Sequence, residues 1–405
     1  MITVQFILKY TIVFYLCYNS VMRRFSLFII ALFLTCSCAF AQHNVSFVYI
    51  NGSNNNNEKM ANWFDKGVKN LHKVLRKKFL TNKTIQKYFQ TESAQLNIKE
   101  DPVIFFWGYQ SKQDLDFLKS KLEISKALSS SGAYMARNLI TQCMHDAIWV
   151  QKPQHMVLIL EKLNETVKKE ADEGNYVVLY GYSAGTFITY EYLFRNLRYV
   201  NLEELFKNYN ANEEVIKFVK NNPRENTCIS ALLENSANIG TISQTGKFLL
   251  NPNIEQLKEN YLKIDDYTNT VCAPKDKVVG VVNYASPLPL FYSNLADDDY
   301  DQNYAGAEMI KHMYEKGIFF ITINFREDPL GIPTSSNLKI SEIKEILNTD
   351  FDNPQGLIYD NSGVWSKRPF PMAHTSYWKA KNAFAKAIVN SFVKGYKFQY
   401  DENTK

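Results

Sequence analysis

The segment Gly181–Gly185, with the sequence GYSAG, places one serine between two glycines in the middle of the chain. It fits the pattern G-x-S-x-G, in which small residues flank the serine because a sharp strand-to-helix turn leaves no room for larger ones. An apolar run over 176–180 precedes it, and a helical pattern over 186–197 follows it. The pattern predicts Ser183 as a nucleophile and the amide of Ala184, at a helix N-terminus, as an oxyanion donor. The alternative is an ordinary glycine-rich turn.

A serine hydroxyl is a poor nucleophile at neutral pH, so a base must lie within hydrogen-bond reach of it. His374 is the predicted base, because Pro369 and Pro371 keep its segment out of a helix and a helix is expected directly after it. The alternative is a histidine that packs within its own loop. The other five histidines lie near the expected mature N-terminus or within predicted helices: His43, His72, His145, His155 and His312.

The imidazole in turn needs an acid to orient it. Asp328 is the predicted acid, because it comes soon after the apolar run 318–325 and precedes Pro329, where the chain must turn. One predicted helix and one predicted strand then separate it from the histidine, which gives the chain order Ser, Asp, His. Glu327 and Asp360 are rivals for this role, and the alternative for Asp328 is a turn-forming aspartate before proline.

Strands that alternate with helices must position these residues. Predicted strands, nearly all apolar, cover 45–50, 103–107, 176–180, 278–282, 318–325 and 357–359. Predicted helices cover 59–79, a stretch that ends at about 173 with a break at 129–132, 186–197, 305–316, 338–347 and 376–393. This order predicts an α/β fold with a mostly parallel central sheet flanked by helices, with the reactive groups at the strand C-terminal ends. Residues 200–275 are more polar, show no clear strand, and are expected to form a largely helical cap insertion.

The serine turn, the aspartate after a late strand and the histidine before the last helix together resemble the α/β-hydrolase superfamily. The resemblance covers most of residues 45–393, excluding the insertion, and implies acyl-enzyme chemistry of the lipase and esterase type. Members commonly carry a His-Gly pair after an early strand to complete the oxyanion hole, and the matching position here is Asn51-Gly52. The second donor is therefore expected at the amide of Ser53, with Gly52 allowing a close approach. The alternative for Gly52 is a plain loop glycine.

The N-terminal 41 residues have the parts of an export signal. After Met22 come two arginines, an apolar run over 25–34 and the triplet Ala39-Phe40-Ala41, so cleavage is expected after Ala41. Residues 1–21 form a second apolar run, which is either an upstream-start artefact or an uncleaved anchor; neither run reaches the ~20 apolar residues of a spanning helix. The expected organisation is an extension and signal peptide over 1–41 and one hydrolase domain over 42–405.

Cysteines and acidic residues indicate few further sites. Once the signal is removed, Cys143, Cys228 and Cys272 allow at most one intramolecular disulfide and leave one thiol. No Cys/His spacing indicates a zinc site, and no cofactor is expected. The acidic segment 297–308 has carboxylates at calcium-loop spacings, but Gln302 stands where a sharp-turn glycine belongs. A calcium loop and a solvated acidic loop are the two alternatives.

The sequence thus predicts an exported serine hydrolase, periplasmic or secreted, that cleaves a carboxylic ester. A small-molecule or lipid acyl ester is the expected substrate, and contact with a membrane surface is compatible with it. The net charge of +5 includes three basic residues within the first 41, which leaves +2 for residues 42–405. Such a small excess does not indicate a nucleic-acid surface, so no nucleic-acid partner is expected. Two alternatives stay open: a secreted serine peptidase of the same fold, and a non-catalytic binding protein on a hydrolase scaffold.

Overall fold

A computed structural model of the chain describes residues 41–53, 58–89, 94–126, 130–197, 213–224, 276–293, 318–332, 358–366 and 372–401, together with Arg368 and short pieces between 202 and 274. The predicted helices at 305–316 and 338–347, the acidic segment 297–308 and residues 1–40 lie outside this part of the chain. None of the helices in the described residues is long and apolar enough to cross a membrane.

Seven strands form one sheet through the centre of the described structure. Their order is β2-β1-β4-β7-β8-β9, and β3 also pairs with β1. Every pairing in this sheet is parallel, which confirms the predicted α/β class. The strands are β1 Ala41–Ile50, β2 Ala94–Ile98, β3 Val103–Phe105, β4 Tyr176–Tyr182, β7 Val278–Tyr284, β8 Phe319–Phe325 and β9 Ile358–Val364.

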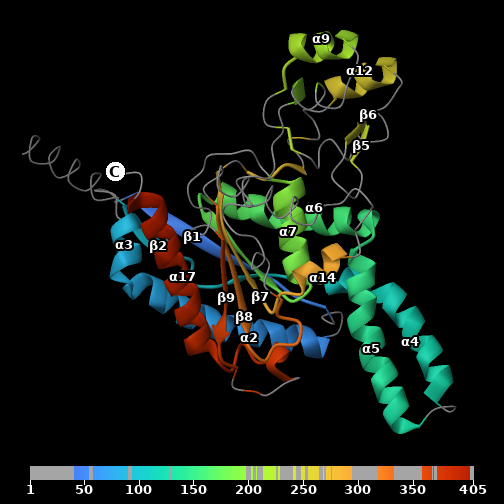
Figure 1. Cartoon of the computed structure of the whole chain (residues 1–405), viewed down its shortest axis with the longest axis vertical. Coiled ribbons are helices and arrows are strands. Elements are labelled where there is room, and N and C mark those ends of the chain that lie inside the picture. The colour runs from blue at the N-terminus through green and yellow to red at the C-terminus, as the bar shows by residue number, and fades with distance from the viewer. Residues whose placement is uncertain are drawn as a thin grey trace, which may run out of the picture.

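Helices cover both faces of this sheet, as Figure 1 shows. One face carries α2 Glu58–Thr81, α3 Lys83–Phe89 and α17 Lys381–Asp401, and the other carries α6 Pro153–Asp172 and α7 Gly185–Arg195. The residues of β1 alternate between the two resulting cores, as the pleat of a strand requires. Phe47 and Tyr49 pack beneath α2 and α17, whereas Val48 and Ile50 pack beneath α6 and α7.

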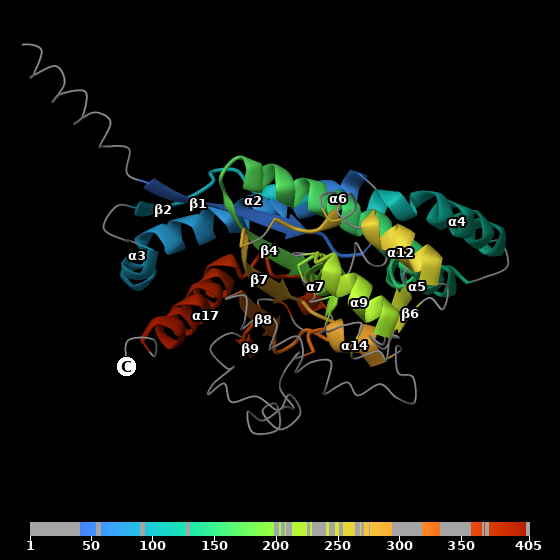
Figure 2. The same ribbon diagram turned by 90° about the horizontal axis from the view of Figure 1, so that it is seen from above.

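Further helices follow β3 and β7. A 3-10 turn, η1 Gly108–Ser111, leads into α4 Lys112–Lys126 and α5 Ser131–Val150, which confirms the predicted helical stretch, although α5 begins within the predicted break at 129–132. Figure 2 shows α4 and α5 at the opposite end of the molecule from α3 and α17. A short helix, α14 Leu288–Ser293, follows β7.

The insertion at 200–275 differs from the prediction in one respect: it contains strands. Two short antiparallel strands, β5 Gly240–Ile242 and β6 Phe248–Leu250, accompany the helices α9 Glu213–Asn221 and α12 Ile254–Leu262. Strands of three residues give too short a pattern to be recognised in a polar segment. In Figure 1 these elements lie above α6 and α7.

A disulfide and a set of amide hydrogen bonds fix the base of the insertion. Cys228 and Cys272 are joined, with the α carbons 5.6 Å apart, which agrees with the limit of one intramolecular disulfide. Asn196, at the C-terminal end of α7, donates through Nδ2 to the Val271 carbonyl at 2.7 Å and accepts from the Ala273 amide at 2.9 Å. The returning chain is therefore held against α7 on both sides of Cys272.

Candidate active site

Ser183 lies at the turn between β4 and α7, in a backbone conformation that is unusual for a residue with a side chain. Its φ is +53°, in the left-handed region that residues other than glycine rarely occupy. The Ser183 amide donates to the Tyr284 carbonyl at 3.1 Å, which ties the turn to strand β7. Such a strained turn persists only where its surroundings determine it, and here the adjacent strand does so.

The two glycines of the segment leave no space for side chains. A β carbon at position 181 would lie 2.6 Å from the Asn283 Oδ1 atom, and one at position 185 would lie 2.6 Å from the Asn51 carbonyl oxygen. Both distances are far below van der Waals contact. The steric reason for the G-x-S-x-G pattern is therefore present on both sides of Ser183.

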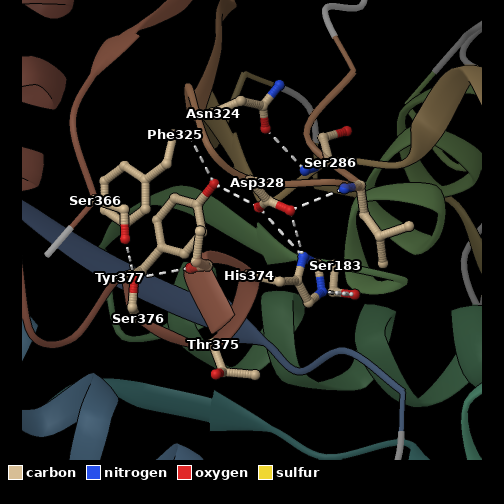
Figure 3. Close-up of polar contacts among 12 residues, drawn as sticks. Ser183, Ser286, Asn324, Phe325, Asp328, Ser366, His374, Thr375, Ser376 and Tyr377 are labelled. Atoms are coloured by element: carbon tan, nitrogen blue, oxygen red, sulfur yellow. Dashed lines mark hydrogen bonds and ion pairs between the residues drawn. The ribbon is translucent and has the colours of Figure 1, made fainter. Parts of the chain in front are cut away.

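The structure brings the predicted serine, histidine and aspartate together (Figure 3). The His374 Nε2 atom lies 3.0 Å from the Ser183 Oγ atom, and the His374 Nδ1 atom lies 2.9 Å from Asp328 Oδ1 and 3.2 Å from Oδ2. An ionised carboxylate only accepts hydrogen bonds, so Nδ1 must carry the proton. Nε2 then presents its lone pair to the serine hydroxyl. This is the tautomer that can take a proton from Ser183.

Asp328 is buried, and the hydrogen bonds around it favour its charged form. Burial by itself raises the pKa of this carboxyl group, but hydrogen bonding and attraction to His374 outweigh it, with help from the Leu330 amide and the Tyr377 hydroxyl, so that the pKa lies below its ordinary value. The Leu330 amide donates to Oδ1 at 2.9 Å and the Tyr377 hydroxyl donates to Oδ2 at 2.8 Å. The site therefore holds a carboxylate next to the imidazole at neutral pH.

The two rivals of Asp328 lie elsewhere. Glu327 accepts through Oε2 from the Ser366 amide at 2.9 Å, so its carboxylate faces the chain after β9. Asp360 lies within β9, in register with Thr322 of the neighbouring strand. Among the acidic residues that the structure describes, Asp328 is the one in hydrogen-bond contact with His374.

His374 lies in a short 3-10 helix, η3 Met372–Thr375, where the sequence predicted a loop. The predicted last helix begins later than expected, at Lys381, after a series of turns. Tyr182 supports this segment: its hydroxyl donates to the His374 carbonyl at 3.0 Å and its ring stacks on the imidazole at 5.7 Å. Because Tyr182 directly precedes Ser183 in the sequence, the chain segment that carries the serine also contacts the segment that carries His374.

The other histidines have structural surroundings where they are described. His72 is buried in α2, between the Tyr49 hydroxyl and the Lys99 carbonyl. His155 stacks on Trp149, with the ring centres 3.9 Å apart. His145 neighbours a buried aspartate in α5, His43 lies in β1, and His312 is outside the described residues.

The expected oxyanion loop lies against the serine turn. A β carbon at position 52 would be 2.7 Å from the Ser183 β carbon, so Gly52 permits the close approach that was predicted. Ser53 follows it and is partly exposed. Ala184 is the residue that precedes the first helical residue of α7, where amide groups are left without partners inside the helix. The amides of Ser53 and Ala184 remain the predicted donors.

Trp107, which the sequence analysis did not single out, holds this loop in place. Its Nε1 atom donates to the Asn51 carbonyl at 2.7 Å, and its own amide donates to Asn51 Oδ1 at 3.0 Å. The Asn51 amide in turn donates to the Phe105 carbonyl at 3.2 Å. Trp107 and Asn51 are fully buried. A tryptophan within a predicted buried strand is the signal that could have identified it, because a buried indole N–H needs an acceptor.

A second turn next to the serine turn was also missed. Ser286 follows β7; its amide donates to Asn324 Oδ1 at 2.9 Å, and its hydroxyl donates to Thr186 Oγ1 at 3.2 Å. Thr186 donates to the Ser183 carbonyl at 2.7 Å. The Ser286 carbonyl accepts from the Ile332 amide at 2.9 Å. Ser286 therefore links the turn that carries the serine to the loop that carries the aspartate.

The described residues contain no cluster of three or more histidine, cysteine, aspartate or glutamate side chains that could hold a metal ion. Comparison of the chain with protein-family models, curated proteins and solved structures found no match. What the site can do follows from its own geometry. In this arrangement His374 can take the proton of Ser183, while the buried carboxylate of Asp328 orients the imidazole and stabilises its charged form.

Proposed function

We propose that the chain has the α/β-hydrolase fold and is an exported serine hydrolase that cleaves a carboxylic ester through an acyl-enzyme on Ser183. The observation that carries the proposal is the 3.0 Å contact between Ser183 Oγ and His374 Nε2, with His374 held in the required tautomer by Asp328. The strained turn at Ser183 and the closely packed Gly52 support the same reaction.

In the acylation step, Ser183 Oγ attacks the acyl carbon of the ester while its proton moves to His374 Nε2. The carbonyl π electrons move onto oxygen, and the amides of Ala184 and Ser53 stabilise the resulting oxyanion. One such donor contributes about 3 kcal/mol to transition-state stabilisation in related chemistry. Collapse of the intermediate breaks the bond to the alcohol oxygen, which leaves with the proton from His374. Asp328 stabilises the imidazolium throughout and keeps its own charge.

In the deacylation step, water takes the place of the alcohol. His374 accepts a proton from this water as its oxygen attacks the acyl-enzyme, and a second oxyanion forms in the same place. Collapse then breaks the bond between Ser183 Oγ and the acyl carbon, and the serine regains its proton from His374. The products are a carboxylic acid and an alcohol, and no cofactor takes part.

The proposed substrate is a small-molecule or lipid acyl ester. The choice rests on the resemblance of the sequence to lipases and esterases, because the insertion at 200–275 is rooted between the end of α7 and the start of β7, at the edge of the sheet opposite Ser183. The proposed export is supported by the signal-like N-terminal sequence and by the disulfide between Cys228 and Cys272, because disulfides persist in oxidising compartments.

The test is labelling of the mature protein with a fluorophosphonate probe, which reacts with activated serines. Wild type and Ser391→Ala are expected to be labelled, since Ser391 lies in α17 and bonds only its own helix at Ala387. Ser183→Ala should not be labelled and His374→Ala should be labelled slowly. Equal labelling of Ser183→Ala, or an unreactive wild type, would overturn the proposal. Parallel assays with short acyl esters and peptide amides distinguish an esterase from a peptidase.

A further inference from the structure

Tyr377 lies three positions after His374 and is fully buried beside Asp328. Its hydroxyl donates to Asp328 Oδ2 at 2.8 Å, and the Phe325 amide donates to the tyrosine oxygen at 2.9 Å. Figure 3 shows the ring reaching from the histidine segment to the aspartate loop. The residue thus connects the two segments that the proposed mechanism must hold together.

The phenolic oxygen has one proton, and its direction is determined by these contacts. The Phe325 amide occupies a lone pair, so the proton is free to point at the carboxylate. The ring itself is fixed: it stacks on the Phe325 ring at 3.9 Å with an angle of 8°, and it meets Phe384 edge-on at 5.2 Å. Tyr377 therefore presents a donor of fixed position to Asp328.

The two carboxylate oxygens of Asp328 accept hydrogen bonds from different donors. Oδ1 accepts from the Leu330 amide and from His374 at the shorter of its two distances, whereas Oδ2 accepts from Tyr377. A donor on Oδ2 withdraws charge from the whole carboxylate. The carboxylate then holds a protonated imidazole less strongly than it would without that donor.

Two further tyrosines and two charged residues lie near this pair among the described residues. Tyr182, at the end of β4, and Tyr284, at the end of β7, face the Tyr377 ring at 6.4 and 5.6 Å. Burial raises the pKa of Tyr284 well above its ordinary value, so it stays neutral. Arg326 and Glu327 adjoin Asp328 in sequence, but they contact Trp365 and Ser366. Asp328 and His374 are thus the charged groups that Tyr377 can influence directly.

We propose that Tyr377 is a positioning residue of the site, which fixes the Asp328 carboxylate and sets how strongly that carboxylate holds the His374 imidazole. The inference rests on the proposed function. Because Tyr377 is argued to act through Asp328, its removal should change the pH profile of the reaction and kcat, and should leave KM near its wild-type value.

The first test is Tyr377→Phe, assayed with a short acyl ester across the acid pH range. We expect kcat to fall about tenfold, because the carboxylate loses the donor that fixes its position beside His374. The acid limb of the kcat/KM profile should move to higher pH, because the carboxylate without this donor holds the imidazolium more strongly. Tyr180→Phe is the matched control: Tyr180 is fully buried and its hydroxyl has no hydrogen-bond partner among the described residues. The control should retain the wild-type profile.

The second test keeps the hydroxyl, in case Tyr377→Phe does not fold. Site-specific replacement of Tyr377 by 3-fluorotyrosine makes the phenol a stronger donor, so the acid limb should move in the opposite direction, to lower pH. An unmoved limb in a folded variant, or a shift with the wrong sign, overturns the inference. If wild type fails to react with the fluorophosphonate probe, the proposed function itself is wrong. A labelled wild type with an unresponsive pH profile contradicts the role of Tyr377 alone.

Discussion

Gly52 lies directly against Ser183, so that a β carbon at position 52 would come within 2.7 Å of the serine β carbon. The loop after β1 and the turn after β4 therefore meet with no space between them. Since the first carries a predicted oxyanion donor and the second carries the predicted nucleophile, their separation would determine where the acyl group of the proposed substrate binds.

Replacing Gly52 by alanine is expected to reduce kcat/KM for a short acyl ester about 100-fold, because one of the two turns must move by a fraction of an ångström or more. Gly132→Ala is the control, since a β carbon at that helical position meets nothing within 4 Å. It should leave activity unchanged. A folded Gly52→Ala protein with wild-type kinetics would show that this contact does not position the reaction.

Trp107→Phe is expected to lower both stability and kcat. The Asn51 carbonyl loses its donor in a fully buried place, which costs about 1–3 kcal/mol of the free energy of unfolding. The matched control is Trp378→Phe, because the Trp378 Nε1 atom has no hydrogen-bond partner among the described residues. Urea unfolding of both variants separates the lost hydrogen bond from the loss of ring size. Equal destabilisation of the two would contradict the role given to Trp107.

Asp328→Asn is expected to reduce kcat by about 10³–10⁴-fold with little change in folding, since an amide cannot hold the imidazole in the same tautomer and charge state. Glu327→Gln is the comparison: the amide oxygen can still accept from the Ser366 amide, so activity should stay near wild type. Steady-state kinetics on an ester substrate measure both. If Glu327→Gln loses activity and Asp328→Asn does not, the acid is Glu327 and not Asp328.

The burial of His72 predicts that the free energy of unfolding falls in acid. This effect is separate from the candidate active site. Burial lowers the pKa of His72 below its ordinary value of 6.5, so the unfolded chain takes up a proton at a higher pH than the folded protein. The free energy of unfolding should be insensitive to this group well above pH 6.5. It should fall as the pH drops below 6.5, by at most about 1.4 kcal/mol per pH unit.

Urea unfolding of wild type and His72→Gln between about pH 8 and pH 5 measures this effect. Glutamine can donate to the Lys99 carbonyl and accept from Tyr49, which are the two contacts of the histidine. The variant should therefore lose the pH-dependent part while keeping its fold. An identical slope in the two proteins would assign the acid sensitivity to other groups.

Much of the central sheet could be predicted from sequence because its strands are continuous apolar runs bounded by polar turns. Strand β2, Ala94–Ile98, was missed although its sequence AQLNI alternates apolar and polar residues, because the segment is short and only Ile98 is of a type enriched in strands. The late start of α17 was missed as well, since residues 376–380 have helical composition but form turns after η3.

The same contrast holds within the candidate site. Ser183, Asp328 and His374 each carry a local signal in turn chemistry or chain order, and the structure places them in contact. Trp107 and Tyr377 act through contacts with residues 56 and 49 positions away. The tryptophan in a predicted buried strand signals an indole N–H that needs an acceptor, but nothing in the sequence marks Asn51 or Asp328 as the partners, so the folded arrangement identifies the pairs.

Helix α7 joins two parts of the molecule that the sequence separates. Its first residue, Gly185, lies two positions after Ser183, and Asn196, directly after its last residue, hydrogen-bonds to Val271 and Ala273 on the two sides of Cys272. A helix of 11 residues is about 16 Å long. Because β4 and β7 are parallel, the end of α7 and the start of β7 lie at the edge of the sheet opposite Ser183, so the root of the insertion stands a full helix length away from the nucleophile.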